Sequence, residues 1–222
     1  MAYTLTMAVA KGRVLDELQE LWIKAGWPWP VASNGRALWF PPSLHAPGLI
    51  IARGQDIPML VQRGIAAFGV VGRDILEEKG ASGVLEVLDL GIAHCHLALA
   101  ARMARWPDGP VRVATKYPRI AQRFFAERQH PIELVALSGS LELAPHIGLA
   151  PYIVDIVQTG RTLRQHDLVE VTRIMDSSAW LIANPAFWRT HADARAVYQQ
   201  LLSAVMSGEM TERDDSLSSP VR

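Results

Sequence analysis

Short apolar segments recur along the chain, and most of them end at a glycine or a charged residue. Apolar residues at the three- and four-residue spacing of a helix usually follow. The first such segment spans residues 5–10, is followed by Lys-Gly-Arg, and leads into apolar residues at three- and four-residue spacing over 14–25. Strand-type and helix-type periods that alternate in this way are typical of α/β proteins with largely parallel strand pairing. The sequence therefore predicts an α/β fold.

The same patterns predict further elements. The expected strands are residues 37–40, 49–52, 67–71, 111–115, 132–137, 152–157, 169–175 and 179–183. The expected helices are residues 57–63, 119–128, 141–149 and 191–206. Residues 84–101 are apolar over too great a length for one ordinary strand, which indicates a segment that passes between two domains. Residues 211–222 are polar and are expected to form a disordered tail.

Composition limits the class of protein. Of the 222 residues, 50% are hydrophobic and 20% are charged, which excludes a largely disordered chain. Lys+Arg and Asp+Glu both number 22, and a net charge of zero argues against a general nucleic-acid binder while allowing a local anion site. No apolar run approaches the roughly 18 residues of a membrane span, and the first residues lack a signal-peptide pattern. We therefore expect a cytoplasmic protein without membrane contact.

Cys95 is the only cysteine, so the sequence permits no intrachain disulfide. His94 and His96 flank it and would share one face of a strand. A zinc site needs at least three protein ligands, and no partner motif accompanies this pair. We expect no protein metal site, and Cys95 in the core.

Residues 152–163 carry the most informative chemistry. An apolar strand bears Asp155 and runs into the turn Thr159-Gly160-Arg161-Thr162. Backbone N–H groups in such a turn converge on an anion, and the threonine hydroxyls add donors. With an acid to accept hydrogen bonds from ribose hydroxyls, the pattern indicates a phosphoribose site. An ordinary strand-to-helix loop with a threonine cap is the alternative.

Charged residues also follow three of the expected strands. Lys11 and Arg13 flank a glycine after the first strand, Arg53 follows residues 49–52, and Asp74 follows a Gly-Val-Val-Gly run. Ligands of α/β proteins bind at the carboxyl ends of strands, so these side chains are candidates for anion binding. Solvated surface charges, and a helix cap for Asp74, are the alternatives.

Six strings together resemble the ATP phosphoribosyltransferase family, which opens histidine biosynthesis. The strings are Ala-Lys-Gly-Arg (10–13), Arg-Gly-Gln-Asp-Ile-Pro (53–58), Gly-Val-Val-Gly-Arg-Asp (69–74), Arg-Val-Ala-Thr-Lys-Tyr-Pro (112–118), Ser-Gly-Ser-Leu-Glu-Leu-Ala-Pro (138–145) and Val-Asp-Ile-Val-Gln-Thr-Gly-Arg-Thr-Leu (154–163). They occur in the family's order and cover residues 5–185 approximately. The chain departs from the family where Ala67 and Pro151 replace acids.

The resemblance implies two α/β domains of the periplasmic-binding-protein type, with the active site in the cleft between them. Residues 1–94 with 177–210 would form domain I, and residues 95–176 would form domain II with the phosphoribose loop. The implied reaction condenses ATP with phosphoribosyl pyrophosphate (PRPP) to N1-(5-phosphoribosyl)-ATP and pyrophosphate, with Mg²⁺ as cofactor. The chain resembles the short form of the family, which implies a homodimer within a hetero-oligomer that contains a regulatory subunit resembling histidyl-tRNA synthetase.

The resemblance also implies residue roles. Lys11, Arg36 and Arg53 are the expected catalytic cations, at pyrophosphate or the ATP phosphates. Within the substrate-binding set, the 159–162 turn would hold the 5-phosphate, Asp155 the ribose hydroxyls, and Asp74 would lie near adenine. The full expected substrate-binding set is Arg13, Asp74, Glu142, Asp155, Thr159, Gly160, Arg161 and Thr162.

Two other functions remain open from the residues alone. Purine and pyrimidine phosphoribosyltransferases share the acid and Thr-Gly-x-Thr loop, although they usually have two adjacent acids where this chain has Val154 and Asp155. A non-catalytic cytosolic module that binds a nucleotide or another solute would use the same fold.

Overall fold

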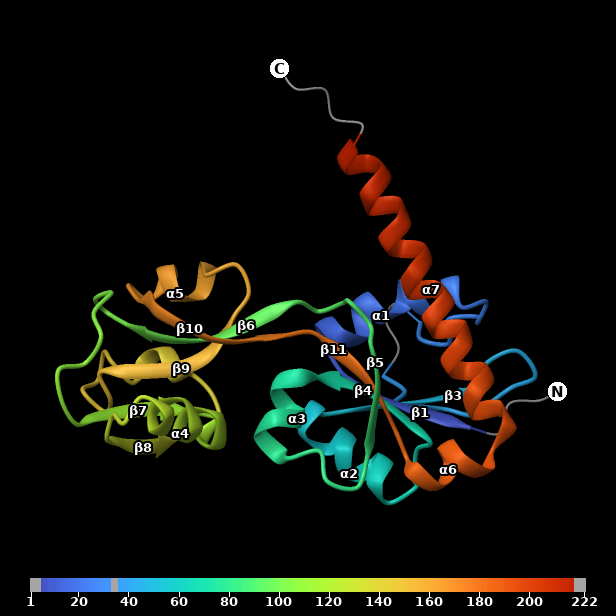
Figure 1. Ribbon diagram of the computed structural model, residues 1–222, viewed down its shortest axis with the longest axis horizontal. Helices are drawn as coiled ribbons and strands as arrows, with labels where there is room; N and C mark the ends of the chain where they lie inside the picture. Colours follow the sequence, from blue (N-terminus) through green and yellow to red (C-terminus); the bar gives the residue numbers. More distant parts are fainter. Residues whose placement is uncertain (1–4, 33–35, 218–222) are drawn as a thin grey trace. The chain divides into compact units, whose positions relative to one another are not determined.

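The computed structural model describes residues 5–32 and 36–217 and divides the chain into two compact units (Figure 1). Unit 1 comprises Met1–Ile75, Ala81–Ala93 and Ser178–Arg222, and unit 2 comprises Leu76–Gly80 and His94–Ser177. The division expected from the sequence assigned Leu76–Gly80 to the other unit. This short segment belongs with unit 2 because the Glu78 carboxylate accepts hydrogen bonds from the first backbone N–H groups of a helix in that unit.

Unit 1 is built on a six-stranded sheet with the order β2-β3-β1-β4-β11-β5. Its strands are β1 (Thr6–Ala10), β2 (Trp39–Phe40), β3 (Gly48–Ala52), β4 (Phe68–Gly72), β5 (Leu85–Asp89) and β11 (Ala179–Ala183). Strands β3, β1 and β4 are parallel, so their carboxyl ends meet at one edge of the sheet. Strand β11 is antiparallel to β4 and β5, and β2 is antiparallel to β3.

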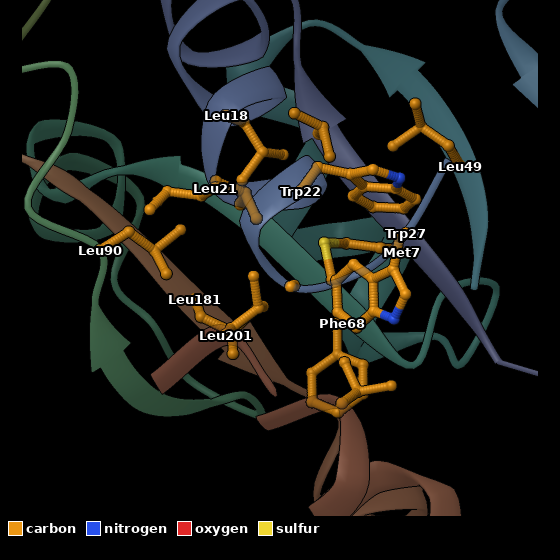
Figure 2. Close-up of a cluster of buried hydrophobic side chains, with 14 of the residues drawn as sticks. Met7, Leu18, Leu21, Trp22, Trp27, Leu49, Phe68, Leu90, Leu181 and Leu201 are labelled. Atoms are coloured by element: carbon orange, nitrogen blue, oxygen red, sulfur yellow. The ribbon is translucent and has the colours of Figure 1, made fainter. Parts of the chain in front are cut away.

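Helices cover this sheet with regularly spaced apolar side chains. They are α1 (Arg13–Lys24), α2 (Ile57–Gln62), α6 (Pro185–Thr190) and α7 (Ala192–Leu217), with α3 (Arg73–Lys79) following β4. Leu18, Leu21 and Trp22 of α1 are buried at three- and four-residue spacing, and Figure 2 shows them gathered with Phe68 and Leu201. Helix α7 buries an apolar stripe in this same core, formed by Ala194, Val197, Leu201, Ala204 and Val205.

Unit 2 holds a five-stranded sheet with the order β10-β6-β9-β7-β8. Its strands are β6 (Cys95–Ala101), β7 (Val111–Thr115), β8 (Ile132–Ala136), β9 (Tyr152–Val157) and β10 (Val169–Ser177), and its helices are α4 (Pro118–Glu127) and α5 (Arg161–Gln165). Strands β8, β7 and β9 are parallel, so they also bring their carboxyl ends to one edge. Helix α4 buries the apolar side chains of Ile120, Phe124 and Phe125.

The directions of the strands correct the expected topology. Among the described residues, four strand pairings are parallel and five are antiparallel, so the pairing is mixed rather than largely parallel. Residues 84–101 are two strands, β5 and β6, one in each sheet. The break between them includes Gly91 and Ala93, which both have positive φ, a conformation that interrupts a strand.

Three further expectations were wrong in part. Residues 141–149 form a 3₁₀ turn, Leu141–Leu143, followed by turns, because Pro145 lacks the N–H that a continuing helix needs. Helix α7 continues to Leu217 through residues expected in the tail, since no proline interrupts it there; residues 218–222 lie outside the described part. Cys95 is half-buried rather than part of the core. No helix in the described part of the chain is long and apolar enough to span a membrane.

Candidate active site

Unit 1 gathers charged side chains at the carboxyl edge of its parallel strands. Lys11 directly follows β1, Arg53 follows β3, and Asp74 lies in the first turn after β4. The Lys11 backbone N–H donates to the Ala52 carbonyl at 2.9 Å, which joins two of these strand ends. The position that a Cβ would take at Gly54 lies 3.7 Å from Ala10 Cβ, so the loop after β3 packs at ordinary contact distance against the end of β1.

Arg36 joins this edge through a strand of the opposite direction. Strand β2 is antiparallel to β3, with Trp39 opposite Ile50, so the residues before β2 lie beside the end of β3. The Ile51 N–H donates to the Leu38 carbonyl at 2.7 Å, which extends the pairing by a step toward Arg36. The structure therefore brings Arg36 toward the edge where Arg53 begins its loop.

The cations at this edge differ in their partners. The Arg13 guanidinium donates to the Ala93 carbonyl at 2.6 Å and lies 3.9 Å from a Glu17 carboxylate oxygen, so it holds the chain after β5 against α1. The side chains of Lys11, Arg36 and Arg53 are exposed and make no ion pair or hydrogen bond with any residue that the structure describes. Three cations without a described counter-charge form a surface suited to an anionic ligand.

The end of β4 contains an acid and a cation in different settings. Asp74 is only 5% exposed. Its neighbour Arg73 forms an ion pair with Glu86 and lies with its guanidinium carbon 4.9 Å from the centre of the Trp180 ring. Arg73 thereby contacts β5 and β11, and these contacts hold the end of β4 against both strands.

Unit 2 presents the Thr-Gly-x-Thr turn at the carboxyl edge of its parallel strands. Gly160 has φ 68° and ψ 5°, the left-handed conformation, and α5 begins at the next residue. The Arg164 guanidinium donates to the Thr159 carbonyl at 3.0 Å, and this hydrogen bond links α5 to the start of the turn. Thr159, Arg161 and Thr162 are exposed, so their side chains and the backbone of the turn are accessible to an anion.

Two carboxylates accompany this turn. Asp155 Oδ1 accepts a hydrogen bond from the Ile156 N–H at 2.8 Å and lies 3.0 Å from Lys116 Nζ. Glu142 Oε1 lies 3.8 Å from His166 Nε2, at the end of α5. Lys116 and His166 were not among the predicted site residues. Lys116 directly follows β7, so the rule that selected Lys11 and Arg53 would also have selected it.

Ala67 and Pro151, which replace two acids expected from the resemblance, lie at the amino ends of strands. Pro151 precedes β9 and is four residues before Asp155, which at about 3.3 Å per residue separates them by about 13 Å. Ala67 is buried immediately before β4, where its N–H donates to the Thr6 carbonyl. Neither position is at the edge that carries the candidate residues, so neither replacement removes a charge from it.

Comparison with known proteins gives a family. A sequence model of the HisG family, described as ATP phosphoribosyltransferase, matches residues 53–207. The protein named ATP phosphoribosyltransferase from Moorella thermoacetica is 44% identical over 214 residues, with 90% of each chain covered. The protein of that name from Bacillus subtilis is 39% identical over 211 residues, which are 94% of this chain and 99% of the relative.

Solved structures agree with these sequence matches. A chain of the ATP phosphoribosyl transferase (HisG:HisZ) complex from Thermotoga maritima matches with a TM-score of 0.76 and 28% identity, over 91% of this chain and 99% of that one. A probable amino-acid ABC transporter extracellular-binding protein from Bacillus subtilis matches with a TM-score of 0.60 over 96% of both chains. At 10% identity this second likeness concerns the fold alone, and it confirms the predicted α/β fold of the binding-protein type. By its sequence matches, this chain belongs to the ATP phosphoribosyltransferase family, whose enzymes perform the first step of histidine biosynthesis.

Proposed function

We propose that this chain transfers the phosphoribosyl group of PRPP to N1 of the adenine of ATP and releases pyrophosphate. The observation that supports this best is that a chain of this family has two different clusters of candidate residues, each at the carboxyl ends of parallel strands. One cluster holds exposed cations without a described counter-charge, and the other holds an acid beside a Thr-Gly-x-Thr turn. Phosphate groups and ribose hydroxyls are the ligands that such clusters suit.

The reaction makes one bond and breaks one. The adenine N1 lone pair forms the new bond to C1 of the ribose, and the electron pair of the broken C1–O bond leaves with pyrophosphate. Positive charge develops on the ribose and negative charge on the leaving group. Orientation of the two substrates and electrostatic stabilisation of pyrophosphate are therefore the main tasks of the protein.

In this proposal the turn at Thr159-Gly160-Arg161-Thr162 binds the 5-phosphate. Asp155, two residues before the end of β9, accepts hydrogen bonds from the ribose hydroxyls. Glu142 contacts a substrate from the neighbouring loop at this edge. Support comes from the exposure of the turn and from the left-handed Gly160, which lets a ligand approach the backbone closely.

Lys11, Arg36 and Arg53 bind the phosphates of the leaving group or of ATP, and Asp74 lies near the adenine. Arginine suits this role because its planar guanidinium binds a phosphate with two parallel hydrogen bonds. Arg13 also belongs to this set, but it contributes less to phosphate binding because its guanidinium already donates a hydrogen bond to the Ala93 carbonyl.

Mg²⁺ dependence is part of the proposal. The described side chains contain no group of three or more His, Cys, Asp and Glu arranged as a metal site. Mg²⁺ commonly binds through substrate phosphates with few protein ligands, and the diphosphate of PRPP offers such oxygens. Bound there, Mg²⁺ would neutralise charge on the departing pyrophosphate. The side chains of the cationic edge would then contact the remaining phosphate oxygens.

The alternative functions receive less support. A purine or pyrimidine phosphoribosyltransferase usually carries a second acid, but the position before Asp155 is Val154, whose side chain is fully buried and faces the core. A solute-binding module rests on likeness of fold at 10–12% identity. The family match over residues 53–207 favours the ATP-dependent reaction.

We further propose that a regulatory subunit resembling histidyl-tRNA synthetase joins homodimers of this chain in a hetero-oligomer. The structurally similar chain from Thermotoga maritima belongs to a HisG:HisZ complex, and this supports a second kind of subunit. A cytoplasmic location belongs to the same proposal, since both substrates are phosphorylated metabolites used inside cells.

Incubation of the protein with ATP, PRPP and Mg²⁺, with and without a regulatory subunit, tests the proposal. The expected result is pyrophosphate release together with the absorbance of an N1-substituted adenine, lost when Mg²⁺ is chelated. Transfer to free purine or pyrimidine bases instead of ATP would support the first alternative. Binding of either substrate without any turnover in both mixtures would support the second.

A further inference from the structure

Lys116 and Asp155 are neighbours because of strand register. Strands β7 and β9 are parallel and pair Thr115 with Val154, so the next residues on each strand lie side by side. The Lys116 Nζ atom lies 3.0 Å from Asp155 Oδ1, and the two side chains are 33% and 25% exposed. The ion pair therefore lies partly shielded from water at the edge that also carries the Thr159–Thr162 turn.

The two oxygens of the Asp155 carboxylate are in different situations. Oδ1 faces Lys116 Nζ and also accepts the Ile156 backbone N–H at 2.8 Å. Within the described part of the chain, Oδ2 has no hydrogen-bond or ion-pair partner. The ion pair and the backbone hydrogen bond both involve Oδ1, so they restrain the rotation of the carboxylate and leave Oδ2 to accept hydrogen bonds from a ligand.

The backbone around Lys116 is itself fixed to β9. The buried Thr115 hydroxyl donates to the Val154 carbonyl at 2.7 Å and accepts the Tyr117 N–H at 2.8 Å. The Lys116 ammonium also lies 5.4 Å from the centre of the Tyr117 ring. These contacts hold both neighbours of Lys116, so the backbone that carries its side chain is fixed in position.

We propose that Lys116 is a positioning residue for the ribose subsite, acting through Asp155. It holds the carboxylate so that Oδ2 is presented to the ribose hydroxyls. Its positive charge also offsets the negative charge of Asp155, which would otherwise repel the phosphate bound by the nearby turn. The inference rests on the proposed function, since it takes the Thr159–Thr162 turn as the site of the phosphoribosyl group.

Steady-state kinetics of Lys116→Ala and Lys116→Arg test this role. Lys116→Ala is expected to raise the KM for PRPP about ten- to a hundredfold, the usual effect of losing a charged hydrogen bond, and to leave the KM for ATP within about twofold. Lys116→Arg should restore most of the loss because it keeps the charge. The control is Arg112→Ala, an exposed cation at the start of the same strand, which should change neither value. An unchanged KM for PRPP in Lys116→Ala would overturn the proposal.

A double-mutant cycle distinguishes action through Asp155 from direct contact with substrate. If Lys116 acts through Asp155, then Lys116→Ala should add little to Asp155→Asn. Full additivity of the two losses would show that Lys116 acts by another route. If Lys116→Ala folds poorly by circular dichroism, Lys116→Met replaces it, since methionine keeps the length of the apolar stem.

Calorimetric titration with ribose 5-phosphate separates this inference from the proposed function. Weaker binding by Lys116→Ala, in a protein that does not react with ATP, would retain the positioning role while the proposed reaction failed. Normal turnover with unaltered ribose 5-phosphate binding in Lys116→Ala would overturn the positioning role alone. Absence of ribose 5-phosphate binding together with absence of turnover in the unmodified protein would overturn both.

Discussion

The carboxyl edges of the two sheets differ in how their candidate side chains are partnered. In unit 1, Lys11 and Arg53 are exposed and have no counter-charge among the described residues. In unit 2, the corresponding edge is already paired, with Asp155 beside Lys116 and the Thr159 carbonyl bound by Arg164. Both edges form in the same way, from three adjacent parallel strands, so the difference comes from the loops rather than from the fold.

This difference suggests a division of tasks. An edge with unpaired cations gains most from a highly charged ligand, such as a diphosphate whose charge increases as it leaves. An edge with a fixed acid and a preformed turn suits a ligand that must be held in one orientation, such as a phosphorylated ribose. Substitutions at the two edges test this division, beginning with the largest expected effect.

Removal of an unpaired cation should chiefly impair turnover. Arg53→Ala is expected to lower kcat about 10²- to 10³-fold, the range for loss of one preorganised donor to a developing negative charge, about 2.7–4 kcal/mol. Arg63→Ala is the matched control, because Arg63 is an exposed arginine at the other end of α2. If Arg53→Ala raised only the KM for ATP and kept kcat, Arg53 would contact ATP in the ground state and the leaving-group role would be wrong.

Removal of the paired acid's charge should chiefly impair PRPP binding. Asp155→Asn is expected to raise the KM for PRPP about ten- to a hundredfold, since a charged hydrogen bond contributes about 1.5–3 kcal/mol. The KM for ATP should change much less. Asp176→Asn, at an exposed carboxylate paired with Arg173 on β10, serves as the control in the same unit. Kinetics of Asp155→Asn equal to those of the control would remove Asp155 from the site.

The preformed turn depends on the backbone of Gly160. Gly160→Ala should destabilise unit 2 by about 1–2 kcal/mol, because an L-residue at φ 68° is strained and the new Cβ would lie 3.0 Å from Arg164 Nη1. Thermal unfolding should show Tm lowered by about 2–8 °C. Gly139→Ala is the control, since Gly139 has open space around it and no positive φ. Equal Tm values for the two variants would mean that the turn relaxes without cost.

Histidine should have almost no effect on the isolated chain. Feedback inhibition requires a second site whose ligand distinguishes two states of the enzyme. The described residues form two compact units, and α6 and α7 both belong to unit 1, where α7 buries its apolar stripe in the core. Titration with millimolar histidine should leave activity unchanged until a regulatory subunit is added. Strong inhibition of the isolated chain that neither substrate relieves would reveal a regulatory site in these units.

Sequence patterns anticipated which residues meet at each edge better than they anticipated the topology. Lys11, Arg53 and Asp74 each follow a short apolar strand, and parallel pairing of those strands brings their ends together. Local periodicity is sufficient for such an inference because each strand and its following loop are contiguous in sequence.

Pairing between distant segments was less accessible from the sequence. Strand β11 pairs antiparallel with β5, 91 to 98 residues earlier, and β10 pairs antiparallel with β6, 68 to 82 residues earlier; nothing in their local pattern indicates that direction. The ion pair of Lys116 with Asp155 likewise depends on the register between β7 and β9, which the sequence does not contain as a local signal. Pro145 was a local signal against the helix expected over residues 141–149.

Crossed binding measurements test the division of tasks most directly. Calorimetry would measure the affinity of ribose 5-phosphate and of pyrophosphate, each with Mg²⁺, for the unmodified chain, Arg53→Ala and Asp155→Asn. The account predicts that Asp155→Asn loses affinity for ribose 5-phosphate and keeps it for pyrophosphate, and that Arg53→Ala shows the reverse. Equal loss of both ligands in both variants, or the opposite pairing of ligand and variant, would contradict it.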